Sequence, residues 1–229
     1  MQAKLLAFSK SKPYSLHMAN AAIFTGDLIG SSKAETDQVD QSIAALAAAS
    51  RKIAEWSGSD TRFTRFRGDG WQAYLGNPGL VCRAMLLFMA TLKSAGGGLS
   101  TRMSIAVGKV NRLGEMGLSD AAGPALTLSG RNLDRSMTFS NLVYAEPEAK
   151  GFWKPAILDL AHWQASRWSR EQAEAVCLAL DLPRPPDADL ARHLGISRQA
   201  LQARLKGSGL MATSNALTAF EIESDISGV

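Results

Sequence analysis

The sequence predicts an α+β fold: a ferredoxin-like sheet that carries helices on one face, followed by an all-α helix-turn-helix domain. Three observations support this prediction. Short apolar runs of strand length alternate with longer segments of helical period, in the order β-α-β-β-α-β-α-β. Apolar residues make up 46% of the chain, which is ample for a core. After residue 150 the composition shifts to helical segments rich in aromatic residues, alanine and leucine.

The elements of the sheet follow from local patterns. The run 19–25 is apolar and short enough for a buried strand, and 33–56 has apolar residues at helical spacing. Two strand-like runs, 61–66 and 71–75, flank a Gly-Asp-Gly turn signal, which indicates a β-hairpin. The remaining elements are predicted as a helix at 80–94, a strand at 101–108, a helix at 121–135 and a strand at 141–145.

Three domains or segments are predicted: a sheet domain at 1–150, a helical connector at 151–168 and a helix-turn-helix domain at 169–229. In the connector we expect Trp153, Trp163 and Trp168 to pack between the two domains rather than to form a cofactor cage. Ser169, with Gln172 three residues later, predicts a capping box at the start of the next helix.

Residues 187–206 have the pattern of a helix-turn-helix. Gly195 is expected at the turn and Ser197 as the cap of the second helix, and the positions expected inside are Leu190, Ala191, Leu194, Ile196 and Leu201. That helix presents the side-chain types that contact base edges and phosphates in a major groove: Ser197, Arg198, Gln199, Gln202, Arg204 and Lys206. DNA is therefore the expected partner. The alternative is a small three-helix packing or dimerisation module.

Charge and hydropathy limit the class of protein. A net charge of +4 and a pI near 9.2 permit contact with nucleic acid without requiring it. No apolar run reaches membrane-spanning length, and the start lacks a signal-peptide core, so we expect a cytoplasmic protein with no membrane partner. Cys82 and Cys177 are isolated on apolar helical stretches and are expected to be buried, reduced thiols.

Two aspartates stand at the ends of predicted strands, each in a Gly-Asp pair. Asp27 follows the first strand, and Asp69 lies in the hairpin turn. If the two strands are neighbours, both carboxylates can bind one divalent cation, and such oxygen ligands suit Mg²⁺ or Mn²⁺, which then bind phosphates. The alternative is that both are turn aspartates that cap the backbone.

Four short segments stand out by their order and spacing: Gly26-Asp27-Leu28-Ile29-Gly30-Ser31-Ser32, Gly68-Asp69-Gly70-Trp71-Gln72, Met103-Ser104-Ile105-Ala106-Val107-Gly108 and Gly123-Pro124-Ala125. Together they resemble the SatD family, a bacterial group of cyclase-like proteins with a C-terminal helix-turn-helix, and more distantly the class III nucleotidyl cyclases. With the C-terminal module, the SatD-like resemblance covers nearly the whole chain.

The resemblance implies a nucleotidyl cyclase-like sheet and roles for seven positions. Asp27 and Asp69 would bind Mg²⁺ or Mn²⁺ through their carboxylates, and Ile29 through its backbone carbonyl. The other positions would contact a nucleoside triphosphate: Arg65 and Asp120 its base, Thr127 its ribose, and Arg131 the phosphate in the transition state. The resemblance also implies a homodimer with composite sites.

This sequence departs from the cyclase pattern at several positions. Arg65 replaces a lysine, Thr127 replaces an asparagine, and Trp71-Gln72 replaces a Phe-Met pair. The first two departures favour a regulator in which the cyclase-like domain binds metal and nucleotide and the helix-turn-helix binds DNA. The intact aspartate pair and Arg131 keep an active nucleotidyl cyclase as the alternative, and a catalytically degenerate dimerisation scaffold is the third hypothesis.

Three local alternatives remain open. Asp120 could be the N-cap of the helix predicted at 121–135, and Arg131 could lie on the solvated side of that helix. Arg65 and Arg67 alternate with Phe66 on a predicted strand, so both are expected on one face, either to bind phosphate or to be solvated.

Overall fold

The computed structural model describes residues 20–58, 61–115, 117–136, 140–149 and 151–226, and it confirms the α+β fold class. The predicted order of strands and helices is also confirmed. In chain order the elements are β1 (Asn20–Ile29), η1 (Ser31–Lys33), α1 (Thr36–Ser57), β2 (Phe63–Phe66), β3 (Gly70–Leu75), η2 (Pro78–Leu80), α2 (Val81–Ser94), β4 (Ser100–Lys109), α3 (Pro124–Ser136), β5 (Leu142–Ala145), α4 (Trp153–Ser166), α5 (Arg170–Ala179), α6 (Asp187–His193), α7 (Arg198–Ser208) and α8 (Leu210–Ile226).

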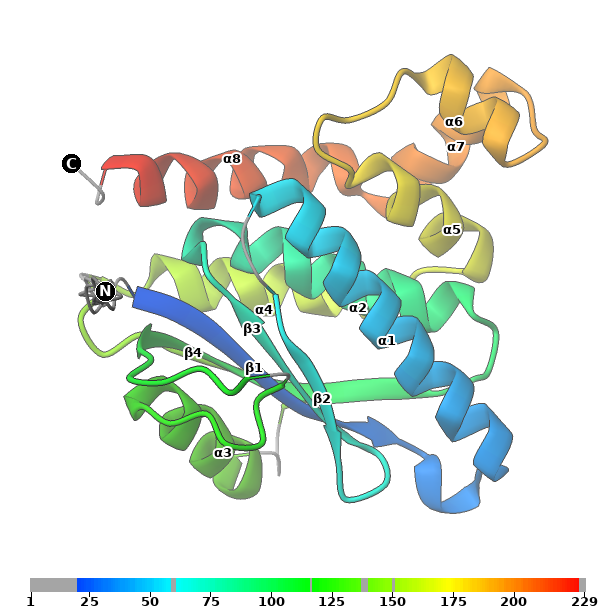
Figure 1. Cartoon of the computed structure of the whole chain (residues 1–229). Helices are drawn as coiled ribbons and strands as arrows, with labels where there is room; N and C mark the ends of the chain where they lie inside the picture. The colour runs from blue at the N-terminus through cyan, green and yellow to red at the C-terminus, as the bar shows by residue number, and fades with distance from the viewer. Residues whose placement is uncertain (1–19, 59–60, 116, 137–139, 150, 227–229) are drawn as a thin grey trace, which may run out of the picture.

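The five strands form one mixed sheet in the order β2-β3-β1-β4-β5 (Figure 1). The first four strands are antiparallel to their neighbours, and β5 runs parallel to β4 at the edge. With α1 and α2 as crossovers, the first four strands have the βαββαβ connectivity of the ferredoxin-like fold. The long strand β1 lies at the centre, so its residues are positioned by strands on both sides.

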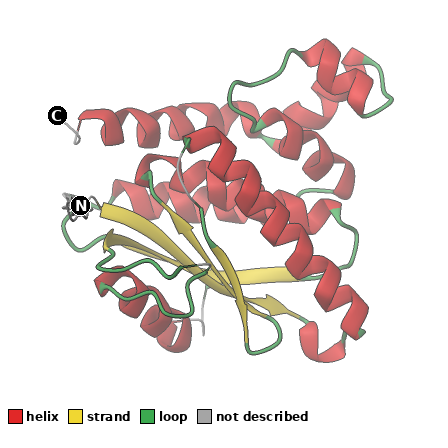
Figure 2. Ribbon diagram, viewed as in Figure 1, coloured by secondary structure: helices red, strands yellow, loops and turns green. Residues whose placement is uncertain are grey.

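Helices cover the two faces of the sheet unequally (Figure 2). The alternation of β1 sends Phe24 into the core beneath α2, where its ring lies 5.4 Å from that of Phe88. Thr25 points the other way, and its hydroxyl lies 2.8 Å from the hydroxyl of Ser129 on α3. Thus α1, α2 and α4 form the expected helical layer on one face. The expectation that the helices lie on one face is wrong for α3, which packs on the opposite face.

The C-terminal helices are joined to the sheet by one continuous core. Helix α5 packs on α2, and α8 lies against α2 and η2. The buried Arg83 of α2 donates a hydrogen bond to Glu221 of α8 at 2.7 Å and one to the carbonyl of Leu180 at 3.0 Å. These contacts hold the helix-turn-helix segment in a defined position relative to the sheet.

Two of the three connector tryptophans pack as predicted. The ring of Trp153 lies 5.0 Å from that of Phe220 in α8, and the buried Trp168 donates to the carbonyl of Ser208 at 2.7 Å. The prediction is wrong for Trp163, which is 57% exposed on the outer side of α4 and packs beside the Arg167 guanidinium.

Two local predictions about turns are also wrong. Helix α3 begins at Pro124, not at residue 121, because Ala122 is still extended and bridges to Arg112; Asp120 is therefore not its N-cap. Strand β2 ends at Phe66, and Arg67 has a positive φ of 48° in the turn, so Arg67 does not share a strand face with Arg65. Both cysteines are free, as predicted. Among the described residues, the helices are too short or too polar to cross a bilayer.

Candidate functional site

The two candidate metal aspartates lie on adjacent parts of the sheet. Asp27 is near the end of β1, directly opposite Gly70 of β3, and Asp69 occupies the β2–β3 turn just before that glycine. The backbone N–H of Leu28 donates to the carbonyl of Asp69 at 3.3 Å. Their strands are therefore neighbours, which was the condition for both carboxylates to bind one cation.

The glycine before Asp27 is required by packing. A Cβ on Gly26 would lie 2.7 Å from the ring of Trp71 and 2.7 Å from the carbonyl oxygen of Arg102, both far inside contact distance. Trp71 is fully buried and stacks on Phe63 at 6.2 Å. Its indole N–H donates to the hydroxyl of Thr101 at 3.0 Å, and that hydroxyl also lies 2.7 Å from the carbonyl of Asp27. The buried Trp71 thus fixes the position of the backbone that carries Asp27.

Arg102 of β4 pairs with Asp27, its direct neighbour across the sheet. Its Nε and Nη2 donate to the two carboxylate oxygens at 2.6 and 2.7 Å, a bidentate arrangement. The hydrogen bonding that Arg102 donates to Asp27 raises the pKa of Arg102, with further contributions from the charges of Asp27, Asp69 and Asp134. Asp27 binds the guanidinium directly, whereas Asp69 and Asp134 act on it through their charge.

Asp69 also has a partner of its own. The hydroxyl of Ser31 donates to its carboxylate at 2.5 Å, and its backbone N–H donates to the carbonyl of Arg67 at 3.1 Å. A divalent cation between the two aspartates would compete with Ser31 and Arg102. Within the described ranges, no group of three or more His, Cys, Asp or Glu side chains is suited to hold a metal ion. Ile29 pairs with Ser100 at the end of β1. The assignment of Asp27, Ile29 and Asp69 to a Mg²⁺ or Mn²⁺ site stays a prediction.

The two residues expected at the base have other partners in this structure. Arg65 donates to the carbonyl of Gly68 and, at 2.7 Å, to the carboxylate of Asp40 in α1. Asp120 is exposed, and its carbonyl accepts two hydrogen bonds from the Arg112 side chain, at 3.0 and 2.7 Å. The loop that carries Asp120 is tied to β2, since the N–H of Leu118 donates to the hydroxyl of Thr64 at 2.7 Å.

Thr127 and Arg131 lie one turn apart on α3, and both are exposed. Together with Asn111 and Pro124 they line an open groove that contains neither Asp27 nor Asp69. Ser129, between them in sequence, faces the sheet, so Thr127 and Arg131 point away from it. One protomer therefore does not bring these residues to the aspartate pair. This is the geometry expected if they serve a partner subunit, and also if they are merely solvated.

The helix-turn-helix is formed as predicted. Helix α6 passes into α7 through Gly195, whose φ is 65°, and the N–H of Ile196 donates to the carbonyl of Ala191 at 3.0 Å. Ser197 caps α7 by accepting a hydrogen bond from the N–H of Ala200 at 3.1 Å. Of the positions predicted to lie inside, Leu190, Ala191 and Leu201 are buried, and Leu194 and Ile196 are half-buried against the same core.

Most of the predicted DNA-contacting residues are exposed on α7. They are Ser197, Arg198, Gln199, Gln202 and Lys206. Arg204 is the exception, because it lies on the side of α7 that packs on α5 and pairs with Glu174 at 3.5 Å, with 25% of its side chain exposed. At the start of α6, Arg184 donates to Asp187 at 2.6 Å and holds the pKa of that carboxyl below its usual value; Gln202 and Arg198 add smaller effects.

Sequence reasoning missed Arg102, Ser31 and Glu174. A signal for Arg102 existed, because the apolar alternation at 103, 105 and 107 implies that residue 102 faces away from the core. Its pairing with Asp27 depended on strand register, which the sequence alone does not supply.

The chain was also compared with known proteins. It matches no protein-family model and no curated protein. The SatD-like and cyclase-like resemblance therefore rests on the four segments, on the aspartate pair and on the helix-turn-helix.

Proposed function

We propose that this protein is a DNA-binding regulator whose helix α7 enters the major groove. One observation carries the proposal: α6 and α7 meet in a helix-turn-helix, with the buried, turn and cap positions all filled by suitable residues. The exposed side of α7 then presents cationic and amide side chains, the types that contact phosphates and bases.

The placement of this motif also supports DNA binding. In Figure 1, α6 and α7 project at one corner of the molecule, away from the sheet. Helix α7 packs mainly on α5, α6 and α8, through its buried residues Leu201 and Leu205, and the carbonyl of Ser208 at its end accepts hydrogen bonds from Gln164 and Trp168. The outer side of α7 is thus free of the sheet domain. Because helix-turn-helix units commonly bind paired half-sites, the proposed working form is a homodimer.

We assign the sheet a regulatory role, with a nucleoside triphosphate and Mg²⁺ or Mn²⁺ bound at Asp27 and Asp69. The placement of Asp27 and Asp69 on adjacent parts of the sheet supports cation binding there. A cation would replace the guanidinium at Asp27, so binding would release Arg102 from β1. Such an exchange of partners gives the two states that a ligand-driven change requires.

Fluorescence anisotropy with a labelled random-sequence duplex tests the DNA proposal. We expect binding that weakens as salt rises, and a logarithmic salt slope that falls by about 1 for each phosphate contact removed. Arg198→Ala and Lys206→Ala should each reduce affinity. Arg51→Ala removes an exposed charge on α1 and should not. Equal affinity of wild type and the Arg198→Ala/Lys206→Ala double variant at every salt concentration would refute the proposal.

An active nucleotidyl cyclase is the second candidate. Its support is that Thr127 and Arg131 share one groove on the outer side of α3, where a partner subunit could reach them. The test is thermal unfolding with ATP, GTP, CTP or UTP and Mn²⁺, on wild type and Asp27→Ala, followed by product analysis. A ligand at 100 times its dissociation constant adds about 2.7 kcal/mol to the free energy of unfolding. Stabilisation lost in the variant, without product, favours the regulator; cyclic nucleotide and pyrophosphate favour the enzyme.

A further inference from the structure

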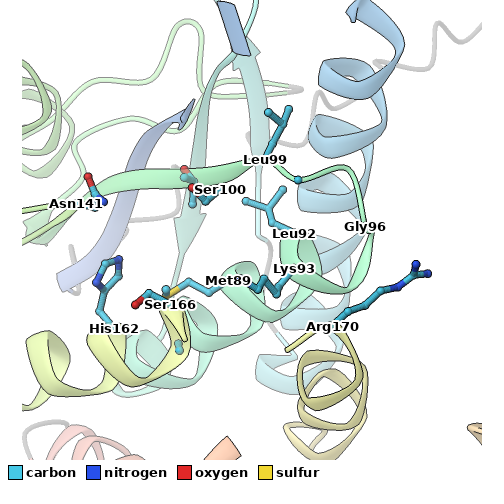
Figure 3. A pocket seen from close by; sticks show the side chains of 13 residues that line it. Met89, Leu92, Lys93, Gly96, Leu99, Ser100, Asn141, His162, Ser166 and Arg170 are labelled. Atoms are coloured by element: carbon cyan, nitrogen blue, oxygen red, sulfur yellow. The ribbon is translucent and has the colours of Figure 1, made fainter. Parts of the chain in front are cut away.

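A cavity lies on the face of the sheet opposite the Asp27–Arg102 pair. It has a volume of about 460 Å³ and is enclosed by the end of α2, the start of β4, α4 and the first residue of α5 (Figure 3). Arg102 and Asp27 point to the α3 side of the sheet, whereas Thr101, next to Arg102, is buried on the core side and contributes to this cavity. The cavity is therefore distinct from the aspartate site.

The cavity combines an apolar interior with polar groups. The apolar part of the wall is formed by Met89, Leu92 and Leu99. The side chain of Met89 reaches towards the centre of the cavity between α2 and α4 (Figure 3). A volume of this size suits a small organic molecule rather than a bare inorganic ion. The ligand is therefore expected to bury an apolar body.

The charged groups around the cavity are all basic. Lys93 and Arg170 carry positive charge, and no carboxylate is found among the described residues that line it. Burial lowers the pKa of His162, so this imidazole is neutral at neutral pH and can donate one hydrogen bond. The side-chain amide of Asn141 adds a further donor. This combination of positive charge and hydrogen-bond donors suits an anionic ligand.

Arg170 connects the cavity to the proposed recognition helix. It packs across Gly96 at the rim, and its Nε donates to Glu174 at 3.2 Å. The other carboxylate oxygen of Glu174 pairs with Arg204 of α7 at 3.5 Å. Glu174 is thus shared between a residue of the cavity and a residue of the proposed DNA-binding helix.

We propose that this cavity binds a small organic anion with an apolar body, and that this binding changes the contacts of α7 through Arg170, Glu174 and Arg204. A bound anion competes with Glu174 for Arg170. Glu174 is then left to pair with Arg204 alone, which holds that arginine on the protein and away from DNA phosphates. The binding step stands by itself, and the effect on DNA rests on the proposed function.

Fluorescence titration of the full chain with 8-anilinonaphthalene-1-sulfonate tests the binding step, because this probe joins an aromatic body to one anionic group. N-phenyl-1-naphthylamine has a similar body without the sulfonate and is the matched probe. We expect saturable binding of the sulfonate and at least tenfold weaker binding of the amine. The Lys93→Ala/Arg170→Ala variant should reduce sulfonate affinity about tenfold, whereas Arg51→Ala should leave it unchanged.

The location of binding is tested with Ser166→Phe, which places a ring in the cavity from its exposed rim. This variant should lose sulfonate binding while its near-ultraviolet circular dichroism shows intact packing. A variant that fails this folding check is replaced by Met89→Trp, which enlarges the side chain that reaches into the cavity from α2. Equal affinity for the two probes, or unchanged affinity in the folded filling variants, would overturn the proposed site.

The coupling is tested by measuring duplex affinity with and without saturating sulfonate probe. We expect wild type to bind the duplex about fivefold more weakly with the probe, at the lower end of common coupling strengths. Glu174→Gln should still bind the probe but show no such change. A wild-type duplex affinity that the probe does not alter overturns the coupling. If no duplex binding is found, the proposed function is refuted instead. The fluorescence titrations then test anion binding in the cavity independently of DNA.

Discussion

The guanidinium of Arg102 holds both carboxylate oxygens of Asp27, at 2.6 and 2.7 Å, across the central pair of strands β1 and β4. The two residues are 75 positions apart in the sequence. The carboxylate that the cyclase-like resemblance assigns to a metal ion is thus already paired with a guanidinium. A metal ion that binds this carboxylate would therefore compete with Arg102.

Removal of Arg102 should show both how much this residue contributes to stability and how strongly it competes with a metal ion. Arg102→Ala leaves the aspartates without their cation, and because 40% of the arginine side chain is exposed we expect a loss of only about 1 kcal/mol in stability. Mn²⁺ should then bind roughly tenfold tighter than in wild type, a difference of about 1.4 kcal/mol. Isothermal titration calorimetry with Mn²⁺ measures this, with Arg102→Lys as the charge-retaining control. Equal Mn²⁺ affinity in all three proteins would remove the metal site from consideration.

The helix-turn-helix depends on the backbone conformation of Gly195. Its φ of 65° disfavours any residue with a Cβ, although no atom lies within 4 Å of the position such a Cβ would take. Gly195→Ala should therefore lower the free energy of unfolding by about 1 kcal/mol through backbone strain alone. The control is Gly130→Ala in α3, where the space is also open and the residue is helical; alanine should add about 0.5–1 kcal/mol there. Urea denaturation measures both, and changes of the same sign would contradict the argument.

Both cysteines should be inert in the folded protein. Burial raises the pKa of Cys82 to about 12 and also raises that of Cys177. Since the thiolate is the reactive form, iodoacetamide at about pH 8 should alkylate neither residue in the time that it fully modifies the urea-unfolded chain. Intact mass spectrometry counts the adducts, and Cys82→Ser and Cys177→Ser assign them. Rapid addition of one adduct to the native protein would show that this thiol is accessible in the folded state.

His162 should make stability depend on pH. Burial lowers the pKa of this imidazole in the folded state, and the charge of Asp159 opposes the shift only in part. As pH falls through about 6.5, the unfolded chain binds a proton that the folded protein resists, so stability is lost. Between about pH 7.5 and 5.5, wild type should lose more stability in urea titrations than His162→Gln. His193 is exposed in both proteins and cancels in the comparison. A parallel decline of the two proteins would show that His162 protonates equally in both states.

Local signals in the sequence were enough to predict the caps and the main elements. Ser169 and Gln172 form the predicted capping box, and Ser197 caps α7, because each motif joins residues only three positions apart. Such bonds form whenever the segment is helical, whatever packs on it. The helix boundary predicted at residue 121 was wrong because a nonlocal bridge between Arg112 and Ala122 keeps that stretch extended.

The sequence by itself determined the α+β class, the order of the elements and the helix-turn-helix, since these follow from hydrophobic period and short-range hydrogen bonds. Only the tertiary structure decided that Arg102 faces Asp27, that α3 takes the second face of the sheet, and that Glu174 lies between Arg170 and Arg204. Each of these depends on strand register or on how helices distant in sequence pack. A shift of one residue in β4 would turn Arg102 to the other face of the sheet and away from Asp27.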